Sequence, residues 1–482
     1  MADVAERSGQ IAPELPTKNL PGVEYRDLPE PKSLGRYMGA SVILAATAMG
    51  SGELIIWPFI TTQVGIGLLW FMAIGFITQY FLNMEIERYT LATGETAVTG
   101  FTRFWMPWGI FFILGAILPN AWPGWATSGA TVLTFIFEWG EGAKIPIAII
   151  FLVAIGLALT LSPVVYQTLE KVQMVLIGII LLFVVVALFV ATTGSAWASV
   201  VTEAPEGAAN FFQSAQLIGG ATLLGAIAFA GAGGANNLVQ SNYIRDKQMG
   251  MGERIPQIVS PITGEEEAAP SLGYMFETNE QNMRRWRDWW RIANQEQLIT
   301  FLGLGLLITI VLSVLVYSTV GVQDLGRDLD FIRAEGDVLK EVIAPWFGTF
   351  FYIAGFVVLF STNIGVVDYI SRLTADSLKV TFLKESTFWS ESKIYASVAW
   401  LIIVAGSIIM LTVSSQPLVL LIIASAGGGV VMFFYAGMLI LLNRRALPEP
   451  IKLKGWRLPV MWFIFIFFGV LTGFMLYSFL AG

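Results

Sequence analysis

Long apolar segments with almost no charged residues constrain the fold of this chain more than any other feature. Only 13% of its 482 residues are charged, whereas soluble domains average about a quarter. A helix needs about 20 mostly apolar residues to cross a bilayer core about 30 Å thick. The pattern predicts an all-α polytopic membrane protein with about 11 transmembrane helices, near residues 37–63, 66–90, 104–135, 145–165, 169–192, 216–243, 295–320, 345–375, 392–413, 416–442 and 457–480.

The basic residues predict how these helices are oriented. If residues 1–36 form a cytoplasmic N-terminal tail and each segment crosses once, 24 of the 28 Lys and Arg residues fall on the cytoplasmic side. Membrane proteins carry such an excess in their cytoplasmic loops. We therefore expect an integral, multi-pass protein of the plasma (inner) membrane, with the C-terminus outside. The tail is polar and contains several prolines, which favours a flexible segment over a cleavable signal peptide.

Two glycine-rich interruptions divide the chain into corresponding halves. The first apolar segment is interrupted at residues 50–53 (GSGE) and the sixth at residues 231–237 (GAGGANN). Helices broken at matching positions of two halves indicate a central binding site. Because each half holds five segments, the second half would insert upside down. We expect inverted repeats at 37–192 and 216–442, followed by an eleventh helix at 457–482.

Two loops of the second half stand out by their composition. The expected cytoplasmic loop 244–294 contains Met283–Arg291 (MRRWRDWWR), whose tryptophans and arginines suit a helix at the membrane interface or a cap over the bundle. The expected outer loop 321–344 carries six Asp and Glu residues. It is either an ordinary solvated loop or one that weakly concentrates cations.

The residues around the two breaks are the candidates for binding a solute. An ionisable group inside a span, such as Glu53, costs several kcal/mol unless it is paired, hydrated or protonated. We expect it to bind the substrate, a coupling ion or a proton. Amides can ligate a cation or an organic solute, although asparagine also caps helix ends. The predicted substrate-binding residues are Gly50, Ser51, Glu53, Gly234, Asn236, Asn237 and Gln240, with Glu53 and Asn236 as metal ligands.

The eighth segment adds candidates for an ion or proton pathway. Ser361 and Thr362 would complete a site beside the first break, unless their hydroxyls bond within their own helix. Asp368 lies further along the same segment, and Arg372 is one turn away, where it can form an ion pair. We expect Glu53, Ser361, Thr362 and Asp368 to serve a coupling ion or a proton.

Six short motifs occur along segments 1–8 in a characteristic order and spacing. They are Trp70, Gln79-Tyr80, Arg88–Gly94, Tyr166–Glu170, Asn236–Ser241 and Ser361–Gly365. Together they give the chain a resemblance to the Nramp divalent-metal transporters, which share the LeuT-type fold of two inverted five-helix repeats. The resemblance covers most of segments 1–8 and implies that the first and sixth helices are broken.

The chain departs from this family at the metal-binding motifs. The family's Asp-Pro-Gly-Asn reads Gly50-Ser51-Gly52-Glu53 here, and its Met-Pro-His reads Gly234-Ala235-Asn236. Thioether and imidazole ligands favour transition metals, whereas carboxylate and amide oxygens suit hard cations. If a metal is carried, we expect a hard and partly hydrated divalent ion such as Mg²⁺.

The leading hypothesis is a secondary active, alternating-access transporter of an inorganic cation. One alternative is ion-coupled transport of a small organic cation or zwitterion, such as an amino acid or amine. Another is a membrane sensor or scaffold that transports nothing. The chain has no cysteine and no histidine, so we expect neither an enzyme nor a cofactor; Mg²⁺, Mn²⁺ or Na⁺ would bind as substrate or coupling ion. We expect no nucleic-acid partner, and a monomer is compatible with the sequence.

Overall fold

The computed structural model describes residues 10–37, 40–48, 50–121, 123–262, 272–326, 328–413 and 416–481. Within these residues the chain forms helices and only three isolated β-bridges. Nine helical stretches in the described residues are long and apolar enough to cross a membrane, and two bent pairs raise that number to eleven. The expected all-α polytopic fold is therefore confirmed. The nine stretches are Ile66–Thr93, Pro107–Phe137, Glu141–Leu161, Val165–Val190, Glu280–Thr319, Pro345–Thr381, Glu391–Thr412, Pro417–Arg445 and Arg457–Leu480.

Most of the spans are continuous helices. The single helices are α4 (Leu69–Thr93), α8 (Lys144–Leu161), α9 (Val165–Val190), α18 (Pro345–Thr381), α19 (Glu391–Thr412), α20 (Pro417–Arg445) and α21 (Arg457–Ala481). The third span is divided into α6 (Pro107–Ile117) and α7 (Gly124–Phe137). The seventh runs from α15 (Glu280–Glu296) through π-helical residues Gln297–Leu304 into α16 (Gly305–Thr319).

The first span is broken where its glycines predict. Helix α2 (Ala40–Ala48) is followed by a π-helical turn at Gly52–Ile56 and then by α3 (Trp57–Val64). The two halves bend by 43°. In the turn, the Ile56 N–H donates to the Ser51 carbonyl at 3.0 Å, an i→i+5 bond. Such π turns occur often at functional sites, because they widen a helix and change the direction of its side chains.

The sixth span is broken at the matching place. Helix α13 (Gly220–Ala228) ends before an irregular stretch, and α14 (Gly234–Asp246) follows it. Gly231 and Gly233 adopt φ of 116° and 69°, values that glycine reaches without the steric cost of a Cβ atom. The chain before α13 consists of α10 (Gly194–Thr202), α11 (Ala204–Ala209) and α12 (Phe211–Ile218), and α12 meets α13 at 102°.

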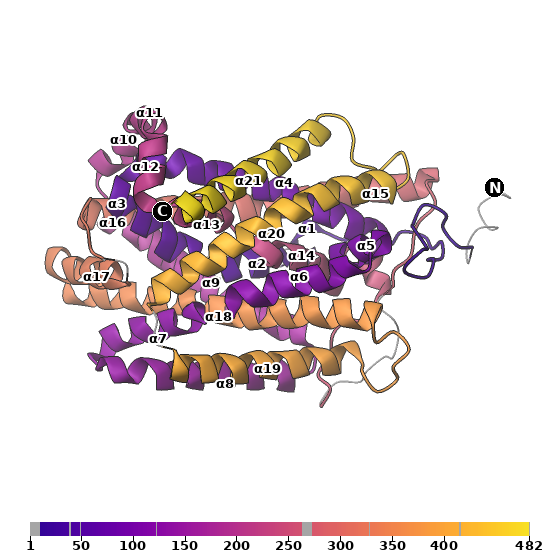
Figure 1. Cartoon of the computed structure of the whole chain (residues 1–482), viewed down its shortest axis with the longest axis horizontal. Helices are drawn as coiled ribbons and strands as arrows, with labels where there is room; N and C mark the ends of the chain where they lie inside the picture. The colour runs from indigo at the N-terminus through magenta and orange to yellow at the C-terminus, as the bar shows by residue number, and fades with distance from the viewer. Residues whose placement is uncertain are drawn as a thin grey trace.

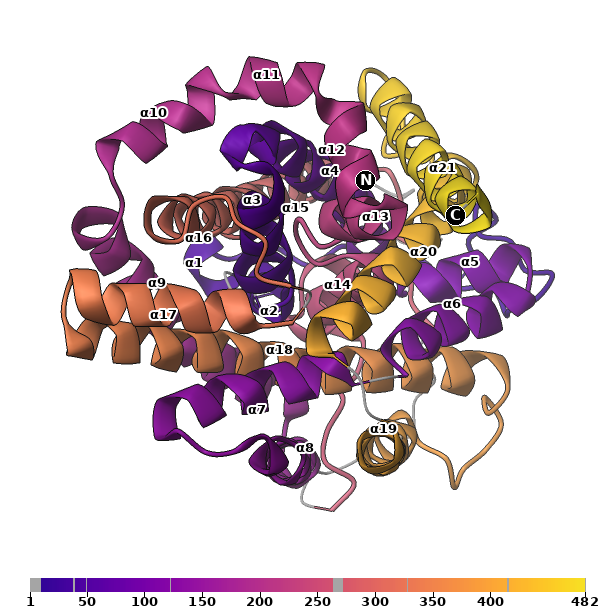
Figure 2. The same cartoon turned by 60° about the vertical axis from the view of Figure 1, so that its left-hand side comes forward.

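The broken helices lie inside the bundle, and the continuous helices surround them. In Figure 2, α2 and α14 occupy the middle of the molecule, where α14 packs against α2, α4, α18 and α20. Figure 1 shows α10, α11 and α17 (Asp330–Val342) at one end of the long axis and α15 at the other. Polar backbone at a break survives inside a membrane only when protein covers it or it lines a cavity, and this arrangement provides that cover.

The expectation of a flexible N-terminal tail is wrong for residues 10–37; residues 1–9 lie outside the described chain. Ile11 pairs with Glu24 as an isolated bridge, and the Trp289 indole donates to the Pro29 carbonyl at 2.8 Å. The Arg103 guanidinium donates to the Pro21 carbonyl at 2.9 Å. The prolines stiffen the segment, and its free carbonyl groups find donors on the bundle. The segment is therefore a docked strap.

The Trp- and Arg-rich segment Met283–Arg291 forms part of α15, which is continuous with the seventh span. The side chains of Trp286 and Trp289 are buried in the protein. The Arg88 guanidinium lies over the Trp290 ring at 4.3 Å, a cation–π contact with α4. Of the two hypotheses for this segment, an interfacial helix or a cap over the bundle, the structure supports the cap.

Candidate functional site

The break in the first span is held by close backbone approaches. The Gly50 N–H donates to the Thr362 hydroxyl of α18 at 3.0 Å. A Cβ atom on Gly50 would overlap that hydroxyl, and one on Gly52 would overlap the Phe229 carbonyl at the end of α13. The small residues therefore allow the two broken spans and α18 to meet at one point. Gly50 was predicted to bind substrate, but its N–H is bonded to Thr362 and it does not line the cavity described below, whereas Ser51 does.

The break in the sixth span is held by one side chain that the sequence interpretation did not assign to the site. The Gln79 amide nitrogen of α4 donates to the carbonyls of Ala228 at 2.8 Å and Ala230 at 2.6 Å. Its oxygen accepts from the Gly233 N–H at 3.0 Å and from the Asn237 amide at 3.3 Å. Gln79 thus satisfies backbone groups that the break releases. An uncharged but strongly polar residue in the middle of an apolar span was the signal for this role.

A cavity of about 30 Å³ lies between the two breaks. That volume holds about one or two water molecules. Its wall includes Ser51 beside the first break, Gly234 and Asn236 at the start of α14, and Thr362 of α18. The structure therefore brings together three of the predicted substrate-binding residues and Thr362, which was predicted for an ion or proton pathway.

The polar wall of this cavity combines oxygen atoms with one N–H donor, because Trp125 lines it and its indole nitrogen has no hydrogen-bond partner among the described residues. The Asn236 side chain is 4% exposed, and its carbonyl oxygen has no hydrogen-bond partner among the described residues. Its amide nitrogen donates to the Ala232 carbonyl at 3.4 Å. Across the cavity, the Asn120 amide donates to the Tyr369 hydroxyl at 2.6 Å; neither residue was predicted. A buried carbonyl oxygen without a donor costs about 1–3 kcal/mol, so Asn236 is prepared to bind a cation or a water.

Glu53 does not line the cavity. It lies in the π-helical turn, its side chain is 1% exposed, and one carboxylate oxygen has no hydrogen-bond partner in the described chain. The expected metal pair of Glu53 and Asn236 is therefore not assembled in this conformation. Within the described residues, no group of three His, Cys, Asp or Glu side chains is placed to hold a metal ion.

Asn237 and Gln240 point away from the cavity as well. The Asn237 amide donates to Gln79, and its oxygen has no hydrogen-bond partner among the described residues, so Asn237 does not cap α14. The Gln240 amide donates to Glu87 of α4 at 2.9 Å and to the Ser41 hydroxyl of α2 at 3.1 Å. Gln240 therefore belongs to a separate polar cluster between α14, α4 and α2.

The hydroxyls of the eighth span connect helices. Ser361 donates to the Ala46 carbonyl of α2 at 3.1 Å and is also hydrogen-bonded to Gln173 of α9. The Gln173 amide donates to the Ser361 carbonyl at 3.1 Å. Thr362 accepts from the first break and reaches the cavity wall. Of this pair, only Thr362 keeps a position from which it can contact a solute.

Asp368 forms the expected ion pair with Arg372, with a shortest N–O distance of 2.9 Å. The hydroxyls of Tyr243 and Tyr395 donate to the same carboxylate at 3.0 and 2.7 Å. Arg372 is also paired with Asp246 at the end of α14. We call these five residues the arginine-paired cluster. Asp368 is thus fully partnered and joins α14, α18 and α19.

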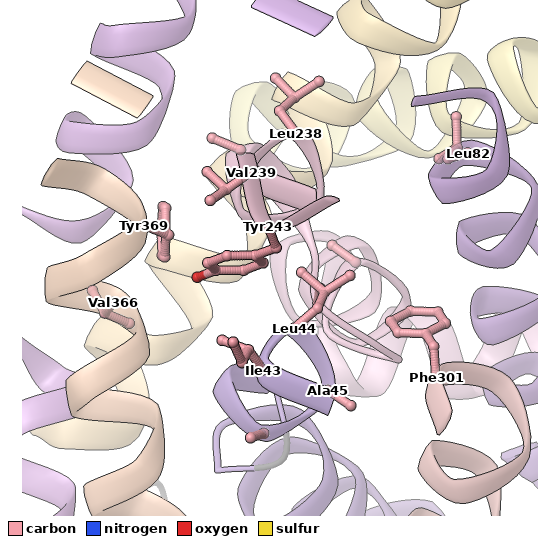
Figure 3. Close-up of a cluster of buried hydrophobic side chains, with 14 of the residues drawn as sticks. Ile43, Leu44, Ala45, Leu82, Leu238, Val239, Tyr243, Phe301, Val366 and Tyr369 are labelled. Atoms are coloured by element: carbon pink, nitrogen blue, oxygen red, sulfur yellow. The ribbon is translucent and has the colours of Figure 1, made fainter. Parts of the chain in front are cut away.

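An apolar layer lies beside the cavity. Figure 3 shows Ile43 and Leu44 of α2 facing Tyr243 of α14, with Val366 and Tyr369 of α18 on the other side. Ile43, Leu44 and Tyr243 are fully buried. Val366 and Tyr369 also line the cavity, and the Tyr243 hydroxyl donates to Asp368, so this layer lies between the cavity and the arginine-paired cluster.

No protein-family model and no curated protein matches this chain. Among solved structures, the chain is similar to the Eremococcus coleocola manganese transporter in complex with an aromatic bis-isothiourea substituted compound, with 15% identity, 98% of this chain and 90% of that chain covered, and a TM-score of 0.63. It is also similar to Mhp1, a nucleobase-cation-symport-1 family transporter, with 15% identity, 93% of each chain covered and a TM-score of 0.54. MhsT in complex with L-phenylalanine shares 14% identity and a TM-score of 0.53, over 95% of this chain and 99% of that chain.

Identities this low show the fold alone. The likeness extends over nearly the whole chain, and the breaks of the first and sixth spans fall where that architecture places them. The chain has the LeuT-type fold of two inverted five-helix repeats followed by an eleventh span.

Proposed function

We propose that this protein is a secondary active transporter that moves a hard inorganic cation by alternating access. The observation that carries the proposal is the small cavity with a polar wall between the two broken helices. Broken helices direct their carbonyl ends, which carry partial negative charge, toward a central site. The unpartnered Asn236 oxygen adds a ligand of the same kind.

The lining favours a hard cation over a soft one. Among the described residues, the lining includes hydroxyl and amide side chains and an indole, and no methionine or histidine. The described lining also contains no carboxylate, so a divalent ion there would retain part of its water shell. Mg²⁺ loses water reluctantly and usually keeps several waters in proteins. We therefore propose a partly hydrated ion such as Mg²⁺ as the substrate.

The size of the cavity argues against an organic substrate. Pockets for organic ligands have volumes of about 300–1,000 Å³, at least about ten times the volume between the breaks. An amino acid or amine would require α2 or α14 to move before it could bind. A partly hydrated cation also needs more room than one or two water molecules occupy, but it requires a smaller movement than an organic solute does.

Glu53 is the proposed partner in coupling. Its carboxylate is buried two residues after Ser51 and lacks a partner for one oxygen. A small change in the π-helical turn would bring it toward the cavity, where it could carry a proton or hold a second cation. We expect Glu53→Gln to abolish uptake while the protein still folds. Normal uptake by this variant would remove Glu53 from the mechanism.

A thermal-shift screen of the purified protein tests the substrate class. Its ligands are Mg²⁺, Mn²⁺, Na⁺, amino acids and polyamines, because a ligand that binds only the folded state raises Tm. Stabilisation by Mg²⁺ that is lost in Asn236→Ala supports the proposal. Stabilisation by an organic solute alone would replace it with the organic substrate, and no ligand effect together with no uptake would indicate a sensor or scaffold.

We also propose that the N-terminal strap and α15 are cytoplasmic, because most basic residues then face inward. The chain has no cysteine, so labelling of a single introduced cysteine shows on which side of the membrane that position lies. Lys454→Cys and Glu341→Cys both change exposed residues. In intact cells a membrane-impermeant maleimide should label only the Glu341 variant; the opposite pattern would invert the orientation.

A further inference from the structure

The cluster that contains Gln240 is separate from the central cavity and has no role in the proposed function. Its members are polar side chains from α2, α4, α14 and the junction of α15 with the seventh span. All are buried, with none more than 1% exposed, and none lines the central cavity. We call it the Glu87 cluster; it consists of Ser41, Asn83, Glu87, Gln240, Glu296 and Gln297.

Hydrogen bonds fix the geometry of this cluster. One carboxylate oxygen of Glu87 accepts from the Gln240 amide at 2.9 Å and from the Gln297 amide at 2.7 Å. The Glu296 carboxylate accepts from the Ser41 N–H at 2.9 Å and from the Ser41 hydroxyl. Because both amide nitrogens donate to a carboxylate, the orientation of each amide group is determined. The carbonyl oxygen of Gln240 is therefore not the atom that contacts Glu87, and it keeps its capacity to accept.

Three oxygen atoms of the cluster have no hydrogen-bond partner in the described chain. They are the second carboxylate oxygen of Glu87, the amide oxygen of Gln240 and the amide oxygen of Asn83. Asn83 lies one helical turn before Glu87 and so on the same face of α4. Three unpartnered acceptors around one carboxylate differ from a core hydrogen-bond network, in which donors and acceptors are matched.

Neighbouring arginines do not balance the charge of Glu87. Within the described residues, no lysine or arginine forms an ion pair with Glu87. Arg88 binds Glu85 at 2.7 Å and the Ile451 carbonyl at 3.0 Å. Arg457 binds Glu85 at 3.3 Å and Asn294 at 2.8 Å. A buried carboxylate without a countercharge is strongly unfavourable, so Glu87 either carries a proton or binds a cation.

We propose that Glu87, Gln240 and Asn83 form a second cation site, for a monovalent hard cation such as Na⁺. The open atoms are one carboxylate oxygen and two amide oxygens, which together carry one negative charge. Oxygen ligands of this kind suit hard cations. Glu296 already accepts both donors of Ser41, so its oxygens are not counted among the open ligands, although its carboxylate lies near Glu87 and adds negative charge beside the site.

Binding at this site would join both broken helices to the rest of the bundle. Gln240 lies on α14, its amide also contacts Ser41 of α2, and Glu87 belongs to the continuous helix α4. A cation held there would therefore stabilise the conformation in which α2 and α14 are closed against α4. This coupling role rests on the proposed transport function, whereas the binding itself does not.

The test compares the Tm of the purified full-length protein in NaCl and in choline chloride at equal ionic strength. We expect Na⁺ to raise the Tm of the wild type and not that of Glu87→Gln. Asn83→Ala, which leaves the charge unchanged, should weaken the Na⁺ effect without removing it. Asn236→Ala in the central cavity is the matched control and should keep the Na⁺ effect while losing the Mg²⁺ effect. Binding of ²²Na⁺ to the same variants gives an independent readout.

The outcomes separate this site from the central one. A wild type with no Na⁺ shift and no ²²Na⁺ binding would overturn the second site, and a Tm that depends on pH alone would assign a proton to Glu87 instead. An Asn236→Ala variant that loses both ion effects would place Na⁺ in the central cavity, which also overturns the inference. If Mg²⁺ fails but the Na⁺ effect follows Glu87, the proposed substrate is wrong and the second site stands.

Discussion

Two buried acidic clusters lie on different sides of α14, and they differ in how their charge is compensated. In the arginine-paired cluster, Asp368 binds Arg372, and Arg372 also binds Asp246. In the Glu87 cluster, only amides donate to Glu87, and three acceptor atoms stay unpartnered in the described chain. The comparison teaches that burial alone does not identify a binding site. A cluster in which an arginine pairs with the acids holds helices together, whereas a carboxylate with unpartnered acceptors and no arginine beside it is open to a ligand.

The largest expected effect comes from a substitution that breaks the arginine-paired cluster. Arg372→Leu leaves Asp368 and Asp246 buried without their shared countercharge, which typically costs about 3–5 kcal/mol. We expect a strong fall in Tm and in the yield of folded protein. Adding Asp368→Asn and Asp246→Asn should recover much of the loss. A single variant as stable as the wild type would show that Arg372 does not balance this cluster.

The second-largest expected fall in stability comes from removing Gln79, an uncharged polar side chain with hydrogen-bond partners. Gln79→Leu should destabilise the protein, because the carbonyls of Ala228 and Ala230 and the Gly233 N–H lose their partner. Each buried group left unsatisfied costs about 1–3 kcal/mol. Thermal unfolding measures this directly, with Gln63→Leu as a control, since its amide nitrogen has no partner among the described residues. Equal Tm values for the two variants would contradict the role of Gln79.

The third prediction concerns a variant whose Tm should not fall in sodium-free buffer, in contrast to that of Arg372→Leu. In sodium-free buffer, Glu87→Gln removes an uncompensated buried charge and leaves the shape of the side chain unchanged. We expect the Tm of this variant to equal or exceed that of the wild type without Na⁺, and to fall below it once Na⁺ saturates the wild type. A variant that is much less stable in both buffers would place Glu87 with the paired, structural acids.

The smallest effect is a pH dependence at a buried acid outside the spans. Glu335 of α17 is 3% exposed, and one of its oxygens has no partner in the described chain. Burial raises the pKa of Glu335 well above its usual value of 4.5. The folded state therefore prefers the protonated form, and stability falls as pH rises from the usual value through the raised pKa.

Glu335→Gln should consequently be more stable than the wild type at neutral pH. The difference in Tm between the two proteins should shrink as the pH falls toward the usual glutamate value, since both side chains are then uncharged. Thermal scans at several pH values measure this difference. A difference that does not change with pH would mean that Glu335 is not the titrating group.

The fold could be predicted from the sequence because hydropathy and charge are visible within short stretches of residues. The two breaks were located from glycine and polar residues alone, and Asp368 was matched with Arg372 from one helical turn of spacing. The docked N-terminal strap was missed, because its donors, Arg103 and Trp289, come from distant parts of the chain. No local pattern predicts such contacts.

The candidate site could be predicted only where its residues lie next to a break in the sequence. Ser51, Gly234 and Asn236 follow the breaks directly, and they line the cavity. Glu53 also follows a break, but the π-helical turn rotates its side chain away from the wall, and sequence periodicity does not reveal a π turn. Asn120 and Tyr369 reach the cavity from the third and eighth spans, so only the packing of those spans identifies them.

Uptake of Mg²⁺ into sealed proteoliposomes tests the central claim most directly. The comparison is between the wild type and Asn236→Ala, reconstituted at equal protein content, with protein-free vesicles as the blank. The account predicts Mg²⁺ accumulation by the wild type that falls strongly in Asn236→Ala, while the variant keeps its fold and its Na⁺-dependent Tm. No uptake of any inorganic cation by the wild type, or equal uptake by the variant, would contradict the claim that the cavity between the two breaks carries a cation.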